Sequence, residues 1–157
     1  YTMPLPEKDE MYLTKGKMLQ DIVVCLGGRI AESLVFDDVT TGAVQDIRQA
    51  TERARDMVTK YGFSDELGMI NYSTSDDEVF IGREIGHAKN FSEGTAAVID
   101  QEVKRIIEGC REKATKILKE NRKVLDKLAE LLIEKERIGQ QEFEALFEQN
   151  DETIEEM

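Results

Sequence analysis

The chain has 157 residues, of which 40% are hydrophobic and 34% charged, so it is long enough to bury a core and has the composition of a globular domain. Its 33 acidic residues outnumber the 21 lysines and arginines, and the formal net charge of −12 argues against binding to nucleic acid or to an anionic membrane surface. No apolar run approaches the roughly 18–20 residues that are needed to cross a bilayer.

The N-terminal part of the chain predicts an extended lead-in followed by a long helix. Pro4 and Pro6 disfavour a helix over residues 1–10. From Thr14, a suitable N-cap, apolar residues recur at helical spacing as far as Leu34. A Gly-Gly pair at residues 27–28 interrupts this pattern, and each glycine costs up to about 1 kcal/mol relative to alanine. We therefore expect another backbone to pack closely against the helix there.

A second helix follows the break at residues 37–39. Thr40 or Thr41 is its expected N-cap, and the helix runs to about Lys60 with Gly62 as its C-terminal cap. The residues expected to face inward are Ile47, Ala50, Ala54, Met57 and Val58. Residues 63–91 are then expected to form a long irregular loop with room for one short strand.

Three more helices are predicted in the C-terminal half. They begin after Ser92, Asn121 and Gly139, and the first of them extends to about Glu120. The expected inward face of the first of them consists of Ala96, Ile99, Val103, Ile106, Cys110 and Ile117. The second carries Val124, Leu125, Leu128, Leu131 and Leu132, and the short third one carries Phe143, Leu146 and Phe147. The sequence thus predicts a mainly all-α helical bundle of about four to five helices over residues 1–150, with residues 151–157 as a frayed acidic tail.

Asp46 is the main candidate for chemistry. It lies in the first turns of the second helix, where a carboxylate interacts favourably with the helix dipole, so a purely structural acid is one interpretation. The other is metal ligation, because zinc accepts carboxylate oxygen as well as histidine nitrogen. The simplest interpretation of Asp37 and Asp38 is that they are acidic residues of a turn. The single histidine, His87, has no partner ligands in its loop and is expected to be exposed or structural.

Several ordered blocks carry a resemblance to a known family. They are LGGRIAE at residues 26–32, TTGA at 40–43 with Asp46, MVTKYGFS at 57–64, FIGR at 80–83 and NFSE at 90–93. In this order and spacing the chain closely resembles the C-terminal part of the peptidase domain of the FtsH family, peptidase family M41, whose members are membrane-bound, ATP-dependent zinc metalloproteases.

The resemblance implies a set of site residues and cofactors. Asp46 matches the position of the third zinc ligand, whereas the two histidines and the general-base glutamate belong to an H-E-x-x-H helix expected upstream of Tyr1. This chain contains no H-E-x-x-H, so no catalytic residue is assigned in it, and we expect the chain alone to be inactive with absent or weak zinc binding. ATP and Mg²⁺ are expected in a separate AAA+ module. Glu32, within the matching Ala-Glu pair, is a candidate to orient a ligating histidine, or is simply a helix acid paired with Arg29.

The resemblance also implies partners and a location. The complete protein would degrade unfolded or membrane proteins as a homo-hexamer, attached to a membrane only through segments outside this chain. This domain would lie on the cytoplasmic side of a bacterial inner membrane. If the protein is an organellar homologue, it would lie in the corresponding reducing compartment of the organelle. A reducing compartment agrees with Cys25 and Cys110, which are predicted to be reduced thiols. The alternatives are a helical oligomerisation or interaction module and a catalytically degenerate scaffold relative.

Overall fold

The computed structural model of the chain describes residues 12–36, 38–73 and 91–155. Within these residues it contains five α-helices, one short 3-10 turn and no strand. The elements are α1 (Lys15–Val35), η1 (Thr41–Ala43), α2 (Val44–Thr59), α3 (Glu93–Glu120), α4 (Arg122–Lys135) and α5 (Gln140–Glu155). The all-α prediction is confirmed. The expected N-terminal lead-in and most of the long loop, including His87, lie outside the described residues.

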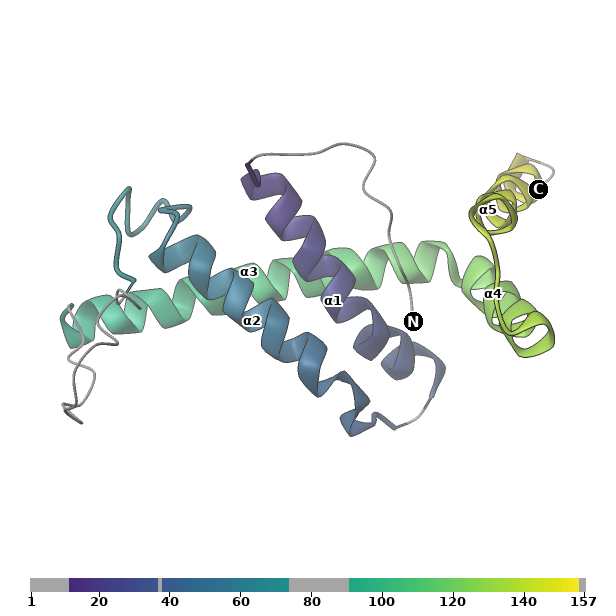
Figure 1. Cartoon of the computed structure of the whole chain (residues 1–157), viewed down its shortest axis with the longest axis horizontal. Helices are drawn as coiled ribbons and strands as arrows, with labels where there is room; N and C mark the ends of the chain where they lie inside the picture. The colour runs from purple at the N-terminus through teal and green to yellow at the C-terminus, as the bar shows by residue number, and fades with distance from the viewer. Residues whose placement is uncertain (1–11, 37, 74–90, 156–157) are drawn as a thin grey trace.

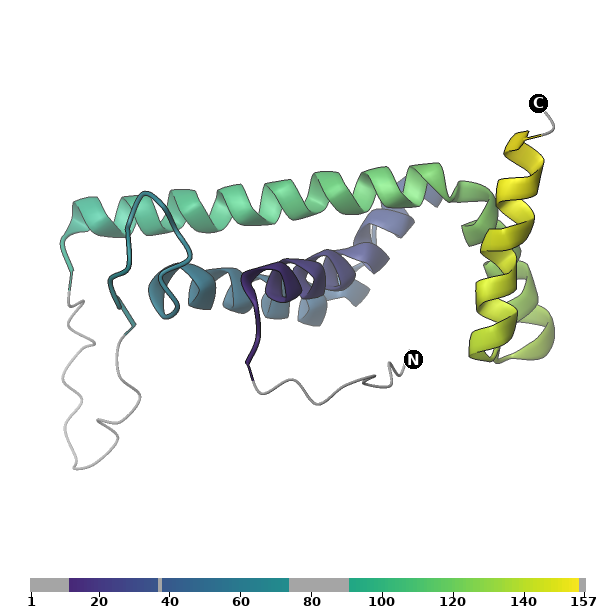
Figure 2. The same ribbon diagram turned by 90° about the horizontal axis from the view of Figure 1, so that it is seen from above.

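The helices form two groups joined by α3. α1 and α2 run in opposite directions, side by side, and both pack on the same side of the 28-residue α3 (Figures 1 and 2). α4 and α5 form a hairpin at the C-terminal end of α3. Side-chain caps are present at α1 and α3, because the Thr14 hydroxyl accepts from the amide of Lys17 at 3.1 Å and the Ser92 hydroxyl accepts from the amide of Thr95 at 3.2 Å. The expected cap of α2 is wrong, because Thr40 caps η1 and Ala43 occupies the N-cap position of α2, and Asn121 makes no side-chain cap bond to α4.

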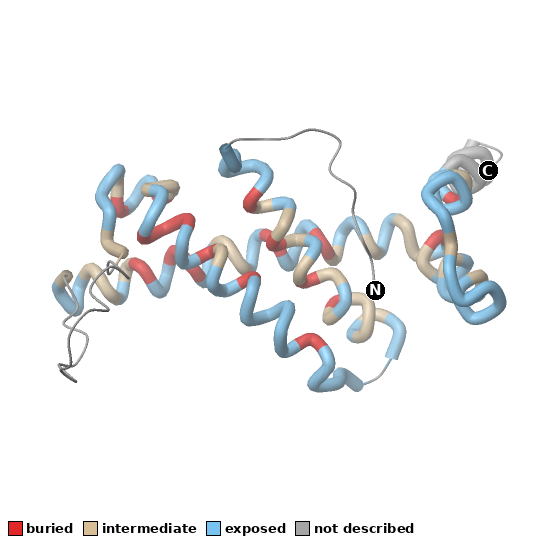
Figure 3. Tube along the Cα trace, in the orientation of Figure 1, coloured by how far each residue is buried: buried red, intermediate tan, exposed pale blue. Residues whose placement is uncertain are grey.

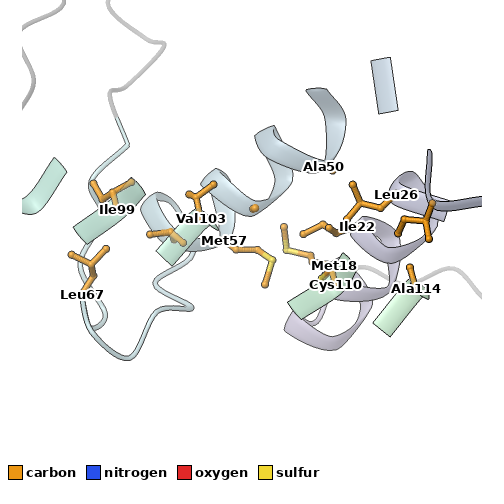
Figure 4. Packing of buried hydrophobic residues seen from close by; sticks show 13 residues of the cluster. Met18, Ile22, Leu26, Ala50, Met57, Leu67, Ile99, Val103, Cys110 and Ala114 are labelled. Atoms are coloured by element: carbon orange, nitrogen blue, oxygen red, sulfur yellow. The ribbon is translucent and has the colours of Figure 1, made fainter. Parts of the chain in front are cut away.

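The buried side chains gather where α1, α2 and α3 meet (Figures 3 and 4). We call this cluster the three-helix core; it consists of Met18, Ile22, Leu26, Ile30, Ala50, Ala54, Met57, Val58, Leu67, Ile99, Val103, Cys110 and Ala114. The small Ala50 and Ala54 are fully buried, which lets α2 approach its neighbours closely. The core therefore holds α2 as a rigid body from Ala50 onward.

Some residues expected to face inward do not. Ile47 and Ile117 are 42% and 43% exposed, so their prediction as inward-facing residues is wrong. Each lies in the first or last turn of its helix, where the neighbouring helices no longer cover it. Among the apolar residues of the last two helices, Leu132, Phe143 and Phe147 are also exposed, at 42%, 41% and 37%. A Cβ added at Gly27 or Gly28 would have no described atom within 4 Å, so no described segment packs closely against the Gly-Gly pair.

The segment after α2 is fixed onto α3 by a buried polar cluster that the sequence did not predict. Gly62 has the positive φ of 62° that ends the helix as expected. Ser64, 2% exposed, then donates its hydroxyl to Glu102 Oε2 at 2.7 Å. Arg105 donates to both oxygens of Glu102 at 2.8 and 2.7 Å. Glu102 is only 5% exposed, so its charge is stabilised by three hydrogen bonds inside the fold.

The α4–α5 hairpin has its own small buried contacts. Val124 and Leu146 are 2% and 6% exposed, and neither belongs to the three-helix core. Arg122 reaches back to α1, donating to the Leu34 carbonyl at 2.9 Å. α5 continues to Glu155, into the segment predicted as an acidic tail. In the described part of the chain, no helix is both long and apolar enough to span a membrane.

Candidate metal-ligand site at the start of α2

Asp46 lies in the first turn of α2 and is the only acidic residue there. Its side chain is exposed, and among the described residues its carboxylate makes no hydrogen bond or ion pair. Other acids nearby are paired: Glu52, further along α2, accepts from Arg48 Nε at 2.9 Å. The Asp46 carboxylate is thus an available oxygen donor on a helix that the core holds in place.

The turn before α2 is held by two charged residues of α1. Arg29 donates from Nη1 to the Thr40 carbonyl at 2.6 Å. Glu32 accepts from the Thr40 amide at 3.3 Å through Oε2 and from the Thr40 hydroxyl at 2.9 Å through Oε1. The Thr40 hydroxyl in turn accepts from the Gly42 amide at 3.2 Å, which caps η1. The expected ion pair of Glu32 with Arg29 is present, with 3.7 Å between Oε2 and Nη1. Glu32 also bonds Thr40, a contact that neither interpretation of Glu32 included. Its role beside a histidine stays a prediction.

A polar strip joins α1 to α2 next to Asp46. Asp21 and Arg53 form an ion pair at 3.1 Å, and Cys25 Sγ lies 4.0 Å from Gln49 Oε1. Burial raises the pKa of the Cys25 thiol; Arg53 lowers it, and the negative charges of Asp46 and Asp21 raise it further. Cys25 is therefore a less acidic thiol than an exposed cysteine.

The described residues alone do not make a zinc site. Protein zinc sites use at least three side-chain ligands, and no group of three His, Cys, Asp or Glu side chains in the described ranges is arranged to hold a metal. Asp46 fits one corner of such a site, because its carboxylate is exposed, unpaired and mounted on a rigid helix. Any remaining ligands have to come from residues outside those described.

Comparison with known proteins places these features in one family. The sequence model of peptidase family M41 matches residues 1–146, a span that includes α1, α2, α3, α4 and Asp46. The chain belongs to peptidase family M41. The predicted family is therefore confirmed, and an unrelated interaction module is not favoured.

The M41 relatives are close in sequence and much longer. The chain is 51% identical to ATP-dependent zinc metalloprotease FtsH 1 of Thermoanaerobacter sp. (strain X514), over 96% of this chain and 25% of that protein. It is 52% identical to the FtsH of Caldicellulosiruptor bescii, over 93% of this chain and 24% of that protein, and 43% identical to that of Thermotoga maritima, over 98% and 25%. The chain thus spans about a quarter of the length of the curated relatives that it matches.

Sequence reasoning found the metal-ligand candidate of this M41 chain but missed what surrounds it. The contact of Arg29 with Thr40 joins residues 11 positions apart and has no periodic signature. The one available signal was the three-residue spacing of Arg29 and Glu32, which puts both on one face of α1 and was interpreted only as an ion pair. The connection to Thr40 became apparent only from the position of η1 against the end of α1.

Proposed function

We propose that this chain is the C-terminal part of the proteolytic domain of a membrane-anchored, ATP-dependent zinc metalloendopeptidase. The observation that carries the proposal is the M41 match over residues 1–146, together with relatives at 51% and 52% identity that are named zinc metalloproteases. Within this domain Asp46 supplies one carboxylate ligand to zinc. Two histidines and a general-base glutamate come from an H-E-x-x-H helix that precedes residue 1 in the complete protein.

The chain's own contribution to that chemistry is to hold a carboxylate in place. Bound zinc acidifies a water molecule and polarises the peptide carbonyl. Asp46 is exposed and lies at the N-terminal end of α2, where a negatively charged side chain interacts favourably with the helix dipole. The three-helix core holds α2 from Ala50 onward, one turn beyond Asp46, so the body of the helix behind the carboxylate is fixed. The chain alone lacks the other ligands and is inactive in this proposal.

The rest of the function belongs to the complete protein. Its ATPase module unfolds protein substrates with ATP and Mg²⁺ and passes them to the peptidase sites of a homo-hexamer. Membrane segments outside this chain anchor it, with the peptidase on the cytoplasmic side of a bacterial inner membrane. The relatives are named ATP-dependent zinc metalloproteases, which supports the ATP-dependent and zinc-dependent parts of this proposal.

The test is zinc content in the protein extended upstream through its H-E-x-x-H segment. The native protein is compared with Asp46→Ala and with Asp56→Ala, which removes another exposed aspartate from the same helix. We expect about one zinc per chain in the native and Asp56→Ala proteins and a clear loss in Asp46→Ala, with unchanged helical circular dichroism. Full zinc in Asp46→Ala refutes Asp46 as a ligand. No zinc in any of the three points to the degenerate scaffold instead.

A further inference from the structure

The first turn of α2 is held in an unusual way. Residues 44–49 are all exposed, and the nearest buried residues are Ala43 before the turn and Ala50 after it, so burial holds the turn that carries Asp46 only at its two ends. Ala43, at the N-cap position of α2, has no side-chain group that could cap the helix. The first α2 residue that is fully buried is Ala50, one turn beyond Asp46. The position of Asp46 therefore depends on what precedes the helix.

The only polar anchor described before this turn is Thr40. All three of its polar groups are occupied: the amide and hydroxyl by Glu32, the carbonyl by Arg29, and the hydroxyl also by the Gly42 amide. Glu32 and Arg29 are themselves half-buried on α1, with side chains 26% and 35% exposed. α1 is fixed in turn by the three-helix core. A continuous set of contacts thus runs from the core through α1 to the start of α2.

We propose that Arg29 and Glu32 form a clamp on Thr40 that positions Asp46 for metal ligation. This inference rests on the proposed function, because it assumes that Asp46 is a ligand. The clamp fixes the residue at which the 3-10 turn begins, and the turn then sets where α2 starts. Metal ligands have to be held within about 0.5 Å of their productive positions, which an exposed and uncapped helix end does not achieve alone.

In this proposal Arg29 and Glu32 are positioning residues and do not touch the metal. Figure 1 shows the connection between α1 and α2 at the end of the helix pair, where η1 turns the chain into α2. Glu32 acts through two bonds to Thr40, whereas Arg29 holds the Thr40 carbonyl and also pairs with Glu32. Loss of either residue leaves Asp46 present but free to move with a frayed first turn.

The test uses the complete protein and two measurements. The first is zinc affinity, from competition with a chromogenic chelator. The second is hydrogen exchange of the metal-free protein in peptides that cover residues 40–49. Three single variants are compared with the native protein: Glu32→Ala, Thr40→Val and Thr40→Ser. Valine keeps the shape of threonine without its hydroxyl, whereas serine keeps the hydroxyl. Glu52→Ala is the control, because it removes an exposed, paired acid of α2 that does not contact Thr40.

We expect Glu32→Ala and Thr40→Val to weaken zinc binding about 10- to 100-fold, as is typical for groups that orient a ligand, and to speed exchange over residues 40–49. Thr40→Ser and Glu52→Ala should behave as the native protein. Asp46→Ala is measured alongside to separate the two proposals.

Each result decides a different point. If Asp46→Ala loses zinc but Glu32→Ala and Thr40→Val do not, the clamp is wrong and the proposed function stands. If Glu32→Ala loses zinc with native exchange over residues 40–49, Glu32 acts by another route and the clamp is again wrong. If Asp46→Ala keeps its zinc, the assignment of Asp46 fails, and the exchange measurement then reports only whether the turn is clamped.

Discussion

Replacing Glu102 with glutamine tests the polar cluster that fixes the segment after α2 to α3. Glutamine keeps the size of the side chain but removes its charge. The native carboxylate accepts from Ser64 at 2.7 Å and from two nitrogens of Arg105 at 2.8 and 2.7 Å. In the variant, the amide NH₂ group faces donors where an acceptor is needed. We expect Glu102→Gln to lower the free energy of unfolding.

The size of the effect follows from the exposure of each partner. The bond from Ser64 is buried, and a buried hydrogen bond to a charged group contributes about 1.5 kcal/mol at the low end of its range. The Arg105 side chain is 65% exposed and regains water, so its pair contributes only about 0.5 kcal/mol. The sum is about 2 kcal/mol, which at this chain length lowers the melting temperature by about 4–8 °C.

The pH dependence gives the sign of the charge effect. Hydrogen bonds from Arg105, opposed by burial and assisted by Ser64, lower the pKa of Glu102 in the folded protein. A depressed carboxylate pKa stabilises the fold fully above the unfolded pKa of about 4.3, and this stability is lost as the pH falls through the folded pKa. The difference between native and Glu102→Gln should therefore be largest at pH 7 and shrink below about pH 4.3.

Thermal unfolding followed by circular dichroism from pH 7 to pH 3.5 measures both effects. Glu108→Gln is the matched control, because Glu108 pairs with Arg111 on the same helix at the same three-residue spacing but about half of its side chain is exposed. It should melt close to the native protein at pH 7. Equal melting temperatures for native and Glu102→Gln at pH 7, or a difference that persists undiminished in acid, would refute the reasoning.

Three further predictions concern the core, the turn after α2 and the surroundings of Asp46. Ile22→Ala, at a fully buried site, should cost about 2–5 kcal/mol in denaturant unfolding, and Val24→Ala, 75% exposed, should cost far less; equal costs would contradict the described core. Gly62→Ala should melt lower than Gly68→Ala, because both have positive φ but only at Gly62 would the new Cβ come within 3.2 Å of the Met69 backbone; the reverse order would be evidence against that close approach. Asp46→Asn should lower the pKa of Cys25 and speed its alkylation at pH 8, whereas Arg53→Ala should slow it; an unchanged rate in Asp46→Asn would be evidence that Asp46 lies away from Cys25.

The local part of the fold was predictable from the sequence. Helical spacing of apolar residues identified all five helices, because periodicity depends only on neighbours along one helix. Thr14 was recognised as a cap for the same reason, since it bonds an amide three residues away. Periodicity gives the direction of a face but not how far the neighbours cover it, which is why Ile47 and Ile117 were misplaced.

The long-range part of the site was not predictable in this way. Ser64 and Glu102 are 38 residues apart, and nothing in either local pattern indicates that they meet. Asp46 was found because its surrounding motif resembles a family pattern, and geometry then added that its carboxylate is exposed and unpaired within the described residues. The other zinc ligands were expected outside this chain, so no analysis of its own residues could locate them.

The α4–α5 hairpin has a consequence for how the molecule melts. Its described buried residues, Val124 and Leu146, are not part of the three-helix core, and it is joined to that core through α3 and the bond from Arg122 to Leu34. Two such units need not lose structure together, so unfolding is expected to be less than fully cooperative. The chain's four tyrosines all precede α3 in the sequence, and Tyr72 packs against the three-helix core. Through Tyr72, tyrosine fluorescence therefore reports on that core, whereas the helical signal reports on both units. A comparison of the two melting curves measures how strongly α3 couples them.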